Sequence, residues 1–128
     1  MSLSNYTETA FANWLRGSAD MPAATTPYLA LFSDNPGETG SGTEVTTDIR
    51  SSGRLAVSFG VPTDGVIANN TALDFGASES DVSVTHFGIY DAQSGGNLLA
   101  YAALASSRTV LTSDKVNWAA GTLVATID

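Results

Sequence analysis

The first 17 residues carry a hydrophobic pattern with helical spacing. Their large apolar side chains recur at intervals of three and four positions and therefore share one face of a helix: Tyr6, Ala10, Phe11, Trp14 and Leu15. Asn5 is the predicted N-cap, since Glu8 three residues later completes a capping-box pattern. Gly17 stands where a helix commonly ends. We predict one amphipathic helix over residues 1–17.

The pattern changes after a linker over residues 18–27, which contains two prolines and little periodicity. Residues 28–33 are nearly all apolar, which is typical of a strand buried on both faces. Residues 54–60 alternate, so that Leu55, Val57 and Phe59 point one way. The strongest strand pattern covers residues 82–91. Weaker strands are predicted over residues 43–47, 66–68, 71–75, 98–104, 109–111, 115–119 and 122–127, with turns at residues 69–70 and 94–97.

Short strands at this regular spacing are typical of all-β domains. We therefore predict a mostly β fold, a single antiparallel β-sandwich (jelly-roll-like) or barrel over residues 28–128, preceded by the one helix and the linker. A chain of 128 residues fits one domain with its own hydrophobic core.

Charge and composition exclude several classes of protein. The chain has 5 basic and 13 acidic residues, a net charge of −8 and no Cys. Without Cys there is no disulfide framework and no thiolate metal site. Five dispersed cations neutralise too few phosphates for nucleic-acid binding. No apolar run approaches the roughly 18 residues of a membrane span, and the start of the chain does not resemble a secretory signal.

The search for catalytic chemistry finds isolated residues only. His86 is the sole histidine and lies in a predicted strand without a nucleophile motif nearby. Glu79 and Asp81 are spaced as paired carboxylates, but we expect them in a solvated turn. Residues 34–38 offer oxygen ligands without a calcium-loop pattern, and no phosphate-binding glycine motif occurs. We predict no enzymatic activity, no cofactor and no metal site; a small hydrolase or a lectin-like binding module is the alternative from another class.

The helix offers the best candidate for a binding site. Aromatic side chains are favoured anchors of protein interfaces, so Tyr6, Phe11, Trp14 and Leu15 are the predicted partner-binding residues. Two alternatives stay open at this stage. The apolar face covers the β domain as a lid, or it packs on a neighbouring subunit or another protein.

Several segments occur in the order found in a known family. They are residues 1–17, Tyr28–Phe32, Gly42–Val45, Arg54–Phe59, Thr85–Asp91, Gly95–Leu99 and Ala119–Leu123. Through this series the chain resembles small virion proteins of tailed bacteriophages that are often labelled tail-fibre-like. The resemblance covers nearly the whole chain and implies a structural protein of the particle, synthesised in the host cytoplasm, without catalysis.

Two positions in the particle fit this resemblance. A chain without internal repeats cannot form a long fibre shaft, and an acidic protein suits a surface away from DNA. Our first hypothesis is therefore a capsid decoration (cement) protein on the capsid exterior, a homotrimer that binds the major capsid protein and neither nucleic acid nor membrane. The alternative is a tail-associated fibre or adaptor protein involved in host receptor binding.

Overall fold

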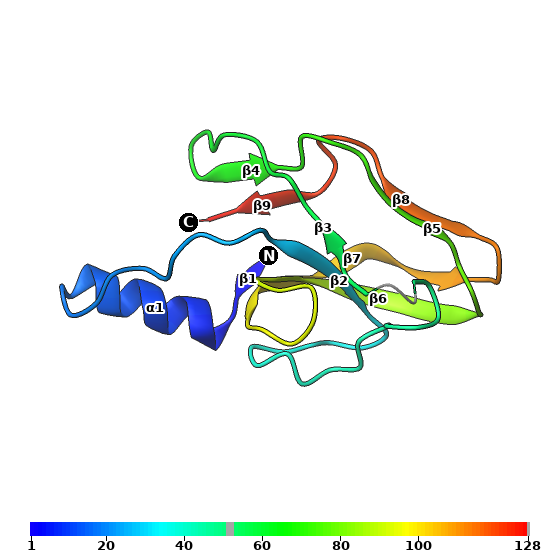
Figure 1. The fold of residues 1–128 in the computed structure, drawn as a ribbon, viewed down its shortest axis with the longest axis horizontal. Helices are drawn as coiled ribbons and strands as arrows, with labels where there is room; N and C mark the ends of the chain where they lie inside the picture. The colour runs from blue at the N-terminus through cyan, green and yellow to red at the C-terminus, as the bar shows by residue number, and fades with distance from the viewer. Residues whose placement is uncertain (51–52, 128) are drawn as a thin grey trace.

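The computed structural model describes residues 1–50 and 53–127, so Ser51, Ser52 and Asp128 of the predicted β domain lie outside the described residues. The fold is mostly β, with 40% strand and 9% helix (Figure 1). The elements are α1 (Asn5–Leu15) and strands β1 (Ser2–Leu3), β2 (Tyr28–Phe32), β3 (Leu55–Ala56), β4 (Val66–Ala68), β5 (Leu73–Ala77), β6 (Val82–Tyr90), β7 (Leu98–Val110), β8 (Lys115–Trp118) and β9 (Val124–Thr126).

The strands form one larger sheet and two small ladders. The larger sheet has the order β1-β7-β6-β2-β3, and the ladders pair β4 with β9 and β5 with β8. All of these pairings are antiparallel, which confirms the predicted antiparallel fold. Within the described residues the larger sheet is open at β1 and β3, so the barrel alternative is not formed.

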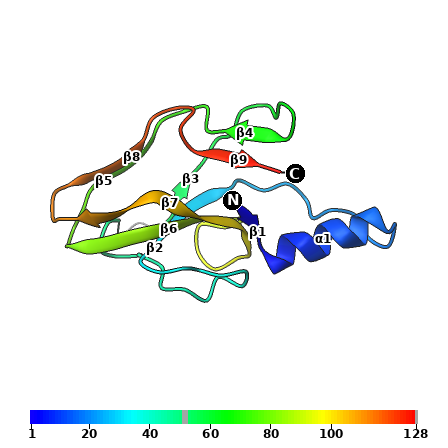
Figure 2. The same cartoon turned by 180° about the vertical axis from the view of Figure 1, so that it is seen from behind.

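The main core lies between two layers, of which one is the five-stranded sheet and the other is formed by the two ladders. Figures 1 and 2 show both ladders on the same side of the five-stranded sheet. Alternate residues of β2, Leu29 and Leu31, face this core, where they join side chains from β5, β6 and β7. Ala30 and Phe32 face the opposite side and form a second cluster with Tyr90 and Leu98. The prediction that this strand is buried on both faces is therefore confirmed.

Two predicted strands differ from the structure. Residues 43–47 do not form a strand; Glu44 makes only an isolated bridge to Phe32. The separate strand predicted over residues 109–111 is wrong, because β7 continues through Val110, where it pairs with Val82 of β6. Local pattern predicts the full length of β6 but not this continuity, because polar residues 106–108 interrupt the apolar pattern and the pairing with β6 shifts register between Ala103 and Arg108.

The alternation over residues 54–60 is correct, although the strand is short. Val57 is buried, whereas Ala56 and Ser58 are exposed. The Val57 N–H donates to the Pro27 carbonyl at 2.9 Å, one position beyond the last paired residues of β2 and β3. The ladder ends there because proline has no N–H to donate in return.

The N-cap of α1 is Ser4, so the prediction of Asn5 is wrong. Ser4 has an extended backbone, and its hydroxyl accepts the Thr7 N–H at 3.2 Å. Both residue types are good N-caps, so tertiary structure decides between them. Ser4 follows β1 directly, its N–H donates to the Leu99 carbonyl at 3.0 Å, and its hydroxyl donates to the Leu98 carbonyl. These bonds fix Ser4 as the last extended residue before the helix begins.

Candidate functional site

Helix α1 is attached to the sheet through its first turn only. The Thr7 hydroxyl donates to the Leu99 carbonyl at 2.8 Å, and the Asn5 N–H donates to the Glu38 carbonyl at 3.1 Å. Beyond this turn the helix extends away from the end of the sheet (Figure 1), and none of its residues is buried. The chain returns through residues 18–27 to β2 (Figure 2).

The four predicted partner-binding residues lie on this projecting helix. The exposed fraction is 38% for Tyr6, 47% for Phe11, 51% for Trp14 and 72% for Leu15. The rings of Phe11 and Trp14 pack against each other with their centroids 5.7 Å apart. The β domain therefore leaves Phe11, Trp14 and Leu15 about half exposed or more, whereas Tyr6, at the attached first turn, is less exposed. Their role in binding a partner stays a prediction.

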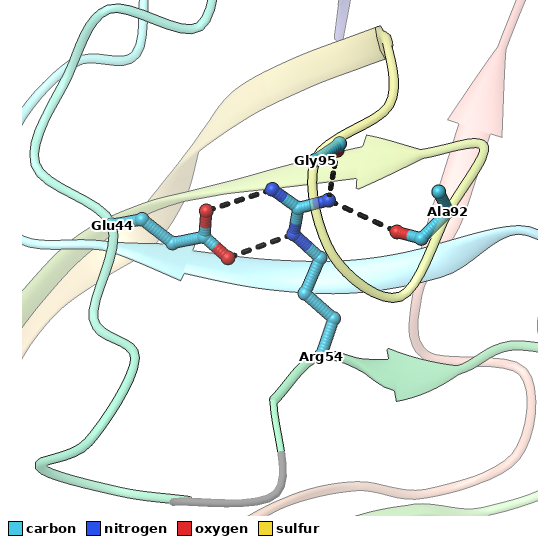
Figure 3. Close-up of polar contacts among 4 residues, drawn as sticks. All are labelled: Glu44, Arg54, Ala92 and Gly95. Atoms are coloured by element: carbon cyan, nitrogen blue, oxygen red, sulfur yellow. Dashed lines mark hydrogen bonds and ion pairs between the residues drawn. The ribbon is translucent and has the colours of Figure 1, made fainter.

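Arg54 holds together the loops at the base of the helix. Its Nε atom lies 2.8 Å from Glu44 Oε1, and its Nη2 atom donates to Glu44 Oε2 at 2.9 Å. Its Nη1 atom donates to the carbonyls of Ala92 at 2.9 Å and Gly95 at 2.7 Å (Figure 3). The guanidinium is buried and lies 3.5 Å from the centroid of the Tyr90 ring. One side chain thus connects three chain segments.

A polar pocket of about 430 Å³ lies beside this ion pair. Asn5 and Tyr6 of α1 line one part of it, and residues of the 38–44 and 90–98 segments line the rest. Burial raises the pKa of Tyr90, an effect that the charge of Arg54 opposes. The Tyr90 hydroxyl is therefore neutral at physiological pH, and the pocket is lined by hydroxyl, amide and carboxylate groups and by the Arg54 side chain.

The residues considered for catalysis occupy ordinary structural positions. His86 lies in the middle of β6, between Phe32 of β2 and Ala103 of β7, and its Nδ1 atom is 2.7 Å from the Thr85 hydroxyl. Asp81 accepts the N–H of Thr112 at 2.7 Å and its hydroxyl at 3.0 Å. The first of these bonds is the largest cause of the lowered pKa of Asp81. This carboxylate thus stabilises a turn.

The side-chain oxygen atoms of Asp34 and Asn35 accept hydrogen bonds from nearby residues. Asp34 accepts the N–H of Thr43 at 2.6 Å and its hydroxyl at 3.0 Å, and the Asn35 side chain accepts the Gly37 N–H at 2.9 Å. Across residues 1–50 and 53–127, no three His, Cys, Asp or Glu side chains are grouped as metal ligands would be. No helix in the described part of the chain has the length and apolar character needed to cross a bilayer.

Sequence reasoning missed the buried polar residues, among them Arg54 and Asn69. Arg54 lies at the start of an alternating segment, but its partner Glu44 becomes visible only when the loop folds back. Asn69, predicted to lie in a turn, has an exposed fraction of 1%. Its amide donates to the carbonyls of Thr71 at 2.8 Å and Ala119 at 3.1 Å, and its side-chain oxygen accepts the Leu123 N–H at 2.8 Å. Asn69 therefore connects the segment that follows β4 to the segment that precedes β9, at one end of their ladder.

Comparison with known proteins adds one finding to this geometry. No curated protein sequence matches the chain significantly. Residues 2–126 match the sequence model of a family described as podophage GP4 fiber I protein gp80. Because the match spans nearly the whole chain, the protein belongs to this family of phage fibre proteins.

Proposed function

We propose that the protein is a non-catalytic structural subunit of a phage tail fibre or adaptor, and that the apolar face of α1 joins it to a neighbouring subunit of the particle. The exposed face formed by Phe11, Trp14 and Leu15 carries this proposal. The family description names a fibre protein, which favours the tail over the capsid exterior. A position at the tail is also compatible with attachment of this protein to a receptor-binding fibre or to the host receptor itself.

The energetics of the helix support an interface role. Burying one large apolar side chain stabilises an assembly by about 1.5–3 kcal/mol, and aromatic residues are common interface anchors. Phe11 and Trp14 are each about half exposed in the isolated chain, so much of their apolar surface is still available for burial. The first turn is fixed by the bonds of Ser4 and Thr7, which presents the rest of the helix in one direction.

The test compares two variants of α1 in phage particles. In Phe11→Ser/Trp14→Ser the apolar anchors are lost, whereas Ala12→Ser alters an exposed position away from the apolar face and serves as the matched control. Quantitative mass spectrometry of purified virions counts the copies, and immunogold labelling locates them. We expect the control to be present in few copies at the tail and the double variant to be absent.

Other results would contradict parts of this proposal. Normal incorporation of the double variant would show that α1 is not the attachment surface. Hundreds of copies distributed over the head would show a capsid decoration protein bound to the major capsid protein. Both variants are first compared with the wild type by thermal melting, so that a loss of incorporation is not a loss of folding.

A further inference from the structure

An open groove lies between β7 and β8. Its volume is about 700 Å³, within the roughly 300–1,000 Å³ typical of binding pockets. Apolar side chains from three strands line it: the partly buried Leu104, Val116 and Trp118, and beneath them Val84 and Val110, which are buried in the main core. Figures 1 and 2 show β8 and α1 at opposite ends of the long axis of the molecule. The chain thus carries an exposed apolar helix at one end and a partly apolar groove at the other.

Among the described residues, neither strand pairs with a neighbour on that side, which leaves the groove open. β1 pairs with β7 only at Ala100 and Tyr101, and the remaining ladder of β7 is with β6. β8 pairs with β5 on its other edge. In the portion of the chain described, no strand pairing joins β7 to β8.

The shape of β7 favours side-chain packing over the addition of a strand. Ala103 pairs with His86 and Arg108 pairs with Val84, so residues 104–107 oppose a single residue of β6. A bulge of this kind breaks the regular spacing of N–H and carbonyl groups that an added strand needs. Leu104, Ala105 and Ser106 of the bulge instead line the groove with side chains. A helix that inserts side chains fits such a surface.

The charges of the groove and of α1 support the interpretation that the inserted helix is α1 of another copy. The groove contains Arg108 and Lys115, two of the five basic residues of a chain with net charge −8. Glu8 is the acidic residue in the first turn of α1, and the i, i+3, i+7 spacing places it beside Phe11 and Leu15. Asp114 also lines the groove, where its carboxylate accepts the Leu111 N–H at 3.0 Å, so the charged lining residues are two positive and one negative.

We propose that the β7–β8 groove binds α1 of a second copy of the chain. This inference rests on the proposed function, in which α1 is an intersubunit surface. It identifies the neighbouring subunit as a second copy of the chain. Helix and groove are different surfaces of one molecule, so the contact is heterologous and assembles copies head to tail. Such a contact closes into a ring when the rotation between copies allows it, and it forms an open filament when the rotation does not.

The test measures the oligomeric state of purified full-length protein by sedimentation velocity. We expect the wild type and Ala12→Ser to associate as concentration rises. Phe11→Ser/Trp14→Ser removes the helix anchors, and Ala105→Glu places a charge at an exposed groove position. Each variant alone is expected to have a dissociation constant raised by about tenfold or more, equivalent to about 1.4 kcal/mol.

Mixing the two variants distinguishes a head-to-tail contact from other assemblies. The helix variant keeps an intact groove and the groove variant keeps an intact helix, so an equimolar mixture is expected to form dimers that neither forms alone. A monomeric wild type, association unaffected by Ala105→Glu, or a mixture without dimers would each overturn the inference. The particle experiment is separate: if the wild type is monomeric but incorporation still depends on Phe11 and Trp14, the proposed function stands and α1 binds another protein.

Discussion

Replacing Arg54 by Met tests the strongest polar interaction of the fold. Met retains an unbranched apolar side chain, but it removes both bonds to the Glu44 carboxylate and the donors to the Ala92 and Gly95 carbonyls. Glu44, whose side chain is 21% exposed, is then left without its charge partner. The 91–97 loop loses its hydrogen bonds from the Arg54 side chain at the same time.

The expected magnitude follows from burial. Removing one partner of a buried ion pair costs about 3–5 kcal/mol, and the partial exposure of Glu44 places this case near 3 kcal/mol. For a chain of 128 residues this corresponds to a Tm lowered by about 10 °C. Glu44→Gln retains a hydrogen-bonding group and is expected to cost about 1–2 kcal/mol.

Differential scanning calorimetry of Arg54→Met, Glu44→Met and Arg54→Met/Glu44→Met gives a double-mutant cycle. The double variant is expected to be more stable than Arg54→Met alone, because the unpaired carboxylate is removed as well. An Arg54→Met protein whose Tm lies within about 2 °C of the wild type would refute the structural role given to this ion pair.

Three further predictions concern other buried or hydrogen-bonded residues. Asn69→Ala leaves two carbonyls and the Leu123 N–H without their side-chain partner, so urea unfolding should show a loss of about 3 kcal/mol; an unchanged midpoint would contradict this role. Ser4→Ala removes the N-cap and the donor to the Leu98 carbonyl, and circular dichroism melts should show a loss of about 2 kcal/mol, against a neutral Thr9→Ser control. The pKa of Asp91 lies below its ordinary value of 3.8, chiefly because the Asn97 N–H donates to its carboxylate. Its stabilising effect is therefore present above that ordinary value and lost as pH falls through the lowered folded pKa, so the Tm difference between wild type and Asp91→Asn should shrink in acid; a difference independent of pH would contradict it.

Local periodicity predicts much of this fold but not the contacts between segments. The run at Tyr28–Phe32 and the alternation around Val57 are visible in the sequence because burial follows side-chain order along a strand. The choice of Ser4 over Asn5 as N-cap depends on pairing with β7, almost a hundred residues later. The apolar face of α1 is likewise evident, whereas its exposure depends on where the first turn is anchored.

The buried polar residues illustrate the same limit. Asparagine is common in turns, so the sequence suggests only a turn at Asn69. Its three side-chain hydrogen bonds become apparent once residues 69–71 are seen to lie beside residues 119–123. The groove between β7 and β8 depends on the bulge between Ala103 and Arg108. Such a register shift is set by the partner strand, so no pattern within β7 alone predicts it.

Electron cryomicroscopy of the assembled virion tests the central claim most directly. We predict that the map places this chain at the tail, with Phe11 and Trp14 of α1 buried against a neighbouring subunit. A map in which the chain lies on the capsid surface, or in which the apolar face of α1 remains exposed to solvent, would contradict the account.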